Sequence, residues 1–195
     1  MDDRLRRQLE FLIELDKAKS VYRRSYVTAE ARNENDAEHM WHLAMFVLVL
    51  AEHAAEPVDV LHALKLVLVH DIVEIDAGDV FVYDEAAAEQ KAELEQAAAD
   101  RIYALLPDDQ RDELRALWEE FEAKETPEAR FAGSVDRLAP LLLNHATKGR
   151  SWREHGITSD RVRDLNRRID AGSPLLWAAA QEAIDDAVAK GYLEP

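Results

Sequence analysis

The sequence has no cysteine, little glycine or proline, and few basic residues relative to acidic ones. The absence of cysteine from 195 residues excludes disulfide bonds and thiolate metal sites. Only six glycines and six prolines interrupt the chain, which favours long helices over a series of short strands. With 24 Lys and Arg against 40 Asp and Glu, the formal net charge is −16, which argues against nucleic acid or an anionic membrane as a partner.

Long apolar runs are also missing. The longest, at residues 40–51, is too short to cross a bilayer and contains His42. The first residues, MDDRLRRQLEFL, are charged and helical rather than a secretion signal. Since 48% of the residues are nevertheless apolar, we expect a folded, soluble, cytoplasmic protein with a single domain over residues 1–195.

Apolar residues recur at helical spacing through most of the chain, which predicts an all-α, single-domain helical bundle. The first helix is expected over residues 2–20 and a loop over 21–35, after which Asp36 is expected to cap the helix that carries His39. Further helices are predicted over residues 60–74, from Asp84 to 106, over 108–124, from Thr126 and Pro127 through Asp136, over 159–171 and over 174–190.

The dipeptide His70-Asp71 lies in the apolar run LKLVLVHDIVE, and packing alone does not explain it. Histidine is only intermediate in burial, and aspartate is rarely buried without a partner. His39 and Asp136 supply two more metal-capable side chains. Asp136 has an alternative as a surface charge paired with Arg137, but the apolar residues around it favour burial. We therefore predict that these four residues, from three helices, bind one divalent cation.

Two imidazoles and two carboxylates suit Co²⁺, Mn²⁺, Fe²⁺, Ni²⁺, Zn²⁺ or Mg²⁺, and the sequence does not choose among them. Such an ion lowers the pKa of water and polarises a phosphoryl group, which is the chemistry of phosphate ester hydrolysis. Glu74 follows His70 by four residues and Asp71 by three, so it shares a helix face with both and is placed to act as general acid or base. Near the C-terminal end of its expected helix it opposes the helix dipole, so a hydrogen bond in the site is expected to compensate.

These residues resemble a known family. The order His39, His70-Asp71, Asp136 is similar to the ligand pattern of the HD-domain metal-dependent phosphohydrolases. The strings NENDAEHMWHLAM, LVHDIVEIDAGDV and LLPDDQRDELRALWEEFEAKETPEARFAGSVDRLAP resemble the subgroup of bacterial 5′-deoxynucleotidases and human HD domain-containing protein 2. The resemblance covers a core over about residues 8–145, and about residues 146–195 are expected to form a C-terminal helical extension.

The resemblance implies a role for each candidate residue. The metal would be held by His39, His70, Asp71 and Asp136. Glu74 would take part in proton transfer, and Asp79 would position water or substrate. The 5′-phosphate would be bound by Arg23, with Arg24 as the alternative. In the bacterial enzymes an aromatic residue follows this arginine, whereas Arg24 and Ser25 follow Arg23 in this chain.

The implied reaction converts a deoxyribonucleoside 5′-monophosphate and water to a deoxynucleoside and phosphate. The resemblance also implies a homodimer, to which the apolar terminal helix with Trp177 could contribute. A dNTP triphosphohydrolase or nucleotide phosphodiesterase would need more positive charge than residues 19–32 offer. A non-catalytic nucleotide sensor is a third alternative, against which the presence of Glu74 argues. One metal ion is preferred, because no other histidine has the spacing of a dinuclear site.

Overall fold

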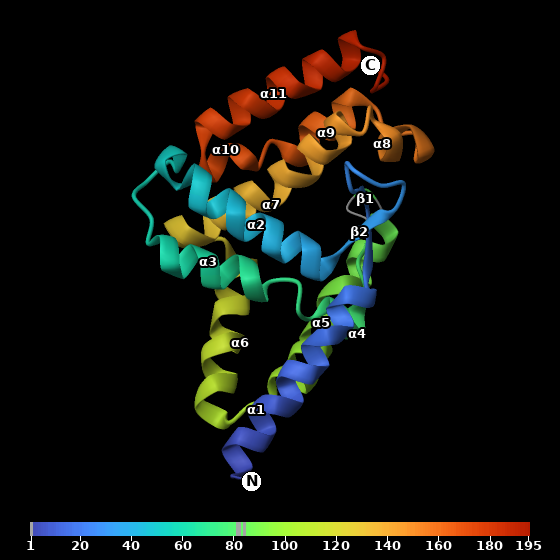
Figure 1. The fold of residues 1–195 in the computed structure, drawn as a ribbon. Coiled ribbons are helices and arrows are strands. Elements are labelled where there is room, and N and C mark those ends of the chain that lie inside the picture. The colour runs from blue at the N-terminus through green and yellow to red at the C-terminus, as the bar shows by residue number, and fades with distance from the viewer. Residues whose placement is uncertain (1, 81–82, 84) are drawn as a thin grey trace.

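The computed structural model of the protein describes residues 2–80, 83 and 85–195. Within these residues the regular structure is almost entirely helical, so the predicted all-α class is confirmed (Figure 1). The α-helices are α1 (Asp3–Glu14), α2 (Asp36–Leu50), α3 (Val60–Val69), α4 (Glu74–Ala77), α5 (Glu85–Tyr103), α6 (Asp108–Ala123), α7 (Pro127–Ala146), α8 (Arg150–Glu154), α9 (Ser159–Asn166), α10 (Ile169–Gly172) and α11 (Pro174–Ala189). Two 3₁₀ helices, η1 (Leu15–Ser20) and η2 (Ala51–His53), and two strands, β1 (Tyr22–Tyr26) and β2 (Asn33–Asn35), complete the set.

Helix α7 is the central element of the bundle. It packs against α2, α3 and α6, and also against α10 and α11 (Figure 1). Its side chains Ala132 and Val135 are fully buried, as are Leu43 of α2 and Leu66 of α3. Burial of this apolar surface fixes the positions of α2, α3 and α7, and each of these helices carries or adjoins a predicted metal ligand.

The segment predicted as a loop forms an antiparallel hairpin, so that prediction was wrong. Strand β1 pairs with β2, with Tyr22 opposite Asn35 and Tyr26 opposite Asn33. Along β1 the side chains alternate, with Arg23 and Ser25 less exposed than their neighbours. The alternation is not visible as hydrophobic periodicity because its inward-facing residues are polar.

The helix predicted over residues 60–74 ends early. Helix α3 stops at Val69, and hydrogen bonds of the tighter i→i+3 type follow, from Ile72 N to Val69 O and from Glu74 N to Asp71 O. Glu74 then begins α4. It therefore lies at a helix N-terminus, where a carboxylate is favourable, and the expectation that it opposes the helix dipole was wrong.

Other boundaries also differ from the predictions. The first helix ends at Glu14 and continues as η1, the helix expected over residues 159–171 divides into α9 and α10, and α8 was not predicted. Asn35, not Asp36, caps α2: its side chain accepts from Glu38 N and its backbone N–H donates to the Glu38 carboxylate. Thr126 caps α7 as expected. The predicted start of a helix at Asp84 lies outside the described residues.

Large apolar side chains remain exposed on α1, α2 and α3. The group on α2 consists of Trp41, Met45, Leu48 and Val49, and Trp41 is 65% exposed. Trp177 of α11, in contrast, packs against the core. No described helix combines the length and apolar character needed to cross a bilayer.

Gly149 gives a test of how the C-terminal end of the chain packs. It has a φ of +68°, and a Cβ added there would lie 1.8 Å from the carbonyl oxygen of Tyr192. Gly156 has a φ of +61° but nothing within 4 Å of that position. We expect Gly156→Ala to lower the free energy of unfolding by about 1–2 kcal/mol, the cost of a left-handed conformation, and Gly149→Ala by about 2–5 kcal/mol because the clash is added. Urea unfolding measures both losses, and equal losses would contradict the contact with Tyr192.

Candidate metal centre

His70 lies in the turn that follows α3, and its side chain is 3% exposed. Its Nδ1 is 3.0 Å from the carbonyl oxygen of Val67. Because a carbonyl only accepts hydrogen bonds, Nδ1 carries a proton, which leaves Nε2 available as a ligand atom. That Nε2 lies 3.1 Å from Asp71 Oδ2 and 3.6 Å from Asp136 Oδ1.

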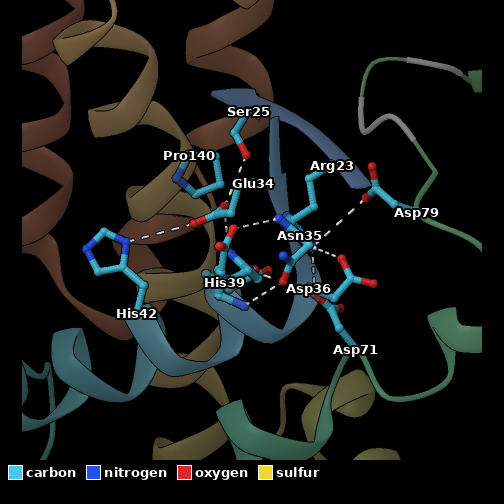
Figure 2. Close-up of polar contacts among 12 residues, drawn as sticks. Arg23, Ser25, Glu34, Asn35, Asp36, His39, His42, Asp71, Asp79 and Pro140 are labelled. Carbon is cyan, nitrogen blue, oxygen red and sulfur yellow. Dashed lines mark hydrogen bonds and ion pairs between the residues drawn. The ribbon is translucent and has the colours of Figure 1, made fainter. Parts of the chain in front are cut away.

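His39 lies one turn into α2 and is fully buried. Its Nε2 is 3.1 Å from Asp136 Oδ1 and 3.8 Å from Asp71 Oδ2. On the other side of the ring, Nδ1 is 3.4 Å from Glu34, which accepts a hydrogen bond from Ser25 (Figure 2). A carboxylate behind a ligating histidine orients the ring and raises its basicity, so Glu34 is placed to support His39 as a ligand.

The donor atoms of the predicted ligands converge. Ligand atoms of His39, His70 and Asp136 all lie within 4.8 Å of one another, and those of Asp36, Asp71 and Glu74 form a second such group beside them. Asp71 is within 3.8 Å of both histidine Nε2 atoms and so adjoins the first group. The buried Nε2 of His70 has no hydrogen-bond partner among the described residues, as expected of an atom that binds a metal. These residues fit a divalent cation of borderline hardness.

Arg23 reaches from β1 into the carboxylates. Its Nη1 donates to Asp71 Oδ2 at 2.6 Å and lies 3.7 Å from Asp36 and 4.0 Å from Asp79 (Figure 2). The same atom lies 3.8 Å from Glu74. The guanidinium thus neutralises several buried acids at once. Arg24, the alternative to Arg23, is the next residue of the strand; its side chain is exposed and also lines the neighbouring cavity.

Glu74 and Asp79 both adjoin this cluster. Glu74 is 3% exposed, and its Oε1 lies 3.6 Å from Lys91 Nζ of α5. Its Oε2 is buried without a hydrogen-bond partner among the described residues. Lys91 is held in turn by Glu95 at 3.0 Å. Glu74 therefore has a cation on one side and the carboxylates of the metal centre on the other.

The close approach of like charges separates the pKa values of these acids. Burial, together with the charge of Asp71, raises the pKa of Glu74 well above its ordinary value and that of Asp36 to about 7. Burial also acts on Asp71, but His70 and Arg23 outweigh it and lower the pKa of Asp71. Burial raises the pKa of Asp79 as well. Burial and neighbouring charges thus raise the pKa of some of these acids and lower that of others, which is a common condition for acid–base chemistry.

A cavity of about 170 Å³ opens beside the centre. Its acidic lining consists of Asp71, Glu74, Asp79 and Asp136, and its basic lining of Arg23, Arg24, Lys91 and Arg137. Asn144, Trp152 and Asn166 contribute from the C-terminal part of the chain.

Several of the residues around the centre were not predicted from the sequence. Asp36 had a signal, because it precedes His39 by three residues and so lies on the same helix face. Lys91 and Asn166 had none, because only the packing of distant helices brings them to the site.

Known proteins resemble this chain over most of its length. The HD domain family matches residues 15–177. A crystal structure from Magnetospirillum magnetotacticum, described as a predicted metal-dependent phosphohydrolase, is 49% identical, covers 98% of this chain and 96% of its own, and superimposes with a TM-score of 0.94. Human 5′-deoxynucleotidase HDDC2 is 33% identical over 135 residues, which are 69% of this chain. The match spans 65% of the human protein's length, which is less than two thirds.

Removing a predicted ligand tests the metal centre. We expect Asp71→Ala to abolish stoichiometric metal binding, because it removes the carboxylate that adjoins both histidines. The control is His62→Ala, since His62 pairs with Glu120 outside the centre, at 2.8 Å. Elemental analysis after equilibration with Mn²⁺ or Co²⁺ and removal of free ion gives the stoichiometry. An Asp71→Ala variant that retained the wild-type metal content would remove Asp71 from the ligand set.

Proposed function

The chain belongs to the HD domain family, and from this membership we propose that it is a metal-dependent phosphohydrolase acting on deoxyribonucleoside 5′-monophosphates. The family resemblance drawn from the sequence is thereby confirmed. The observation that carries the proposal is the convergence of two histidines and two aspartates beside Arg23 and Glu74 at one polar cavity. The similarity to human 5′-deoxynucleotidase HDDC2 supports the substrate class.

One divalent cation would be held by His39, His70, Asp71 and Asp136. When bound, it would lower the pKa of water and polarise the phosphoryl group. Arg23 neutralises the second group: its Nη1 lies 3.7 Å from Asp36 and 3.8 Å from Glu74, and it donates to Asp71, which adjoins both groups. For this reason we propose a single cation.

The remaining residues of the centre would handle protons and orientation. Burial and the charge of Asp71 raise the pKa of Glu74, which favours its protonated form, and as an acid it would donate to the 5′-oxygen of the deoxynucleoside as the bond from phosphorus to that oxygen breaks. Asp79, 4.0 Å from Arg23, would orient water or the substrate beside it. Arg23 would exchange part of its contact with the carboxylates for the phosphate oxygens of the substrate.

The charge of the cavity favours a monophosphate over a triphosphate. The described lining has as many acidic side chains as basic ones, four of each. A divalent cation would therefore leave a modest positive excess, which suits the roughly two negative charges of a phosphomonoester. A triphosphate would add charge for which these residues offer no partner.

Substitution of Glu74 tests the reaction. We expect Glu74→Gln to keep the metal and to lower kcat for deoxyribonucleoside 5′-monophosphates by about two to four orders of magnitude, because the proton donor is lost. Phosphate release is measured with metal-stripped protein to which Co²⁺, Mn²⁺, Mg²⁺ or Zn²⁺ is restored singly. Glu93→Gln, on an exposed part of α5, is the control and should keep the wild-type rate.

The substrate panel separates the alternatives. It contains deoxy and ribo 5′-monophosphates, 3′-monophosphates, dNTPs and cyclic nucleotides. Turnover confined to deoxy 5′-monophosphates supports the proposal, whereas triphosphate release from dNTPs would favour a triphosphohydrolase. Full activity of Glu74→Gln would remove that residue from the mechanism. Absence of turnover with every substrate of the panel, with metal bound to the protein, would favour a nucleotide sensor.

We also propose that the protein is a homodimer formed through the apolar face of α2. Trp41, Met45 and Leu48 are spaced at one helix face and are 65%, 40% and 54% exposed. Soluble proteins rarely leave an apolar row of this kind exposed to solvent. A second copy of the chain, related by a twofold axis, would cover these residues with its own equivalent residues. The high negative charge elsewhere would make other faces repel one another.

A matched pair of substitutions tests this contact. Leu48 on α2 and Leu175 on α11 are 54% and 59% exposed. We expect Leu48→Glu to give a monomer, because it buries a charge in the contact, and Leu175→Glu to remain a dimer. Light scattering coupled to size exclusion measures the mass of each variant. A monomeric wild type would contradict the proposal, and a dimer broken only by Leu175→Glu would move the contact to the terminal helix.

A further inference from the structure

Arg137 is a shielded arginine without an acidic partner. The chain has 40 acidic and 24 basic residues, and many of the basic side chains form ion pairs. Yet Nη1 of Arg137 is buried, with no hydrogen-bond acceptor among the described residues. Arg24, Lys148 and Arg168, which also make no ion pair among the described residues, are exposed to solvent, and Lys124 donates to the carbonyl oxygen of Phe121. The alternative of a surface pair between Asp136 and Arg137 is not what the structure contains, since Asp136 instead contacts His39 and His70.

The unpaired charge lies beside the metal centre. Arg137 follows the predicted ligand Asp136 on α7, and it lines the same cavity as Asp136. Pro140, Leu141 and Asn144 line that cavity too, so one face of α7 leads from the metal centre along the cavity wall. A ligand in that cavity would therefore adjoin both the metal centre and Arg137.

A buried donor on a charged group is costly when it has no partner. No structural contact of the described residues compensates Arg137 Nη1, whereas Arg23 and Lys91 on the same cavity are already committed to carboxylates. Among the basic side chains that line the cavity, Arg137 is therefore the one with a buried donor, Nη1, that has no partner among the described residues. Its planar fork of donors matches the geometry of phosphate oxygens.

We propose that Arg137 is a phosphate-binding residue of this site, which donates hydrogen bonds to the non-bridging oxygens of the substrate's phosphate. The inference rests on the proposed function in that the substrate is a phosphomonoester. It assigns substrate affinity to an arginine of α7 in addition to Arg23 of the hairpin. The two arginines then differ in role, because Arg23 also neutralises the buried carboxylates and Arg137 serves the ligand alone.

Binding of inorganic phosphate tests the proposal without any turnover. Isothermal titration of phosphate into metal-loaded wild type, Arg137→Gln and Arg137→Lys compares the affinities. We expect Arg137→Gln to weaken binding by about 10- to 100-fold, as loss of a charged hydrogen bond implies, and Arg137→Lys to lose less. Arg168→Gln, which removes an exposed and unpaired arginine, is the matched control and should bind as wild type does.

Kinetics supply a readout that a structural role would not move. KM for a deoxyribonucleoside 5′-monophosphate should rise in parallel with the loss of phosphate affinity, while inhibition by the corresponding deoxynucleoside, which lacks phosphate, should stay unchanged. If Arg137→Gln weakened the binding of the deoxynucleoside but not that of phosphate, Arg137 would contact the nucleoside and the proposal would be overturned. Wild-type phosphate affinity in Arg137→Gln, or no phosphate binding by metal-loaded wild type, would overturn it equally.

The failure of this inference is distinguishable from failure of the proposed function. A wild type that hydrolyses no nucleotide but binds phosphate through Arg137 would leave the inference standing and remove the substrate assignment. If the wild type hydrolyses deoxynucleotides and Arg137→Gln leaves KM and phosphate affinity unchanged, the proposed function stands and the role of Arg137 is removed. Metal content and melting temperature of each variant, compared with Arg168→Gln, establish that the variants are folded and loaded.

Discussion

The structure depends on the burial of several carboxylates around two imidazoles. Asp36, Asp71 and Glu74 are at most 8% exposed, and their oxygens lie within 4.8 Å of one another. Charges removed from water are unfavourable unless opposite charges and hydrogen bonds surround them. Arg23 supplies part of this compensation, and a divalent cation would supply more. The hairpin and the turn after α3 bring these groups together, and apolar packing holds α7 beside them.

This constraint explains why irregular backbone occurs where the chemistry is. A continuous helix over residues 60–74 would direct His70 and Asp71 about 100° apart around one axis. The tighter turn that replaces it places Asp71 Oδ2 3.1 Å from His70 Nε2 and starts a new helix at Glu74. The short strand β1 likewise directs Arg23 inward and Arg24 outward, because successive side chains of a strand point to opposite faces. Packing of the apolar helix faces holds the helices in place, and the irregular backbone orients the polar side chains.

What could be predicted from the sequence follows the same division. The long helices were predictable because their apolar stripes and caps are local, as at Thr126 before α7. The candidate ligands were predictable because apolar packing alone seldom places a histidine and an aspartate side by side in a buried run. The hairpin was missed because its inward residues are polar, and the early end of α3 because its run is apolar throughout. The environments of Lys91 and Arg137 depend on which distant carboxylates come near, and no local pattern carries that information.

The net charge of −16 is compatible with an anionic substrate, because overall charge does not decide local affinity. Many acids, such as Asp108 and Glu119, are on exposed helix faces, where water and salt screen them. The cavity lining is balanced, with four acidic and four basic side chains among the described residues. A divalent cation at the centre would shift that balance toward positive charge. Inside a shielded cavity each such charge acts more strongly than one at the surface, so a phosphate can be bound within an acidic protein.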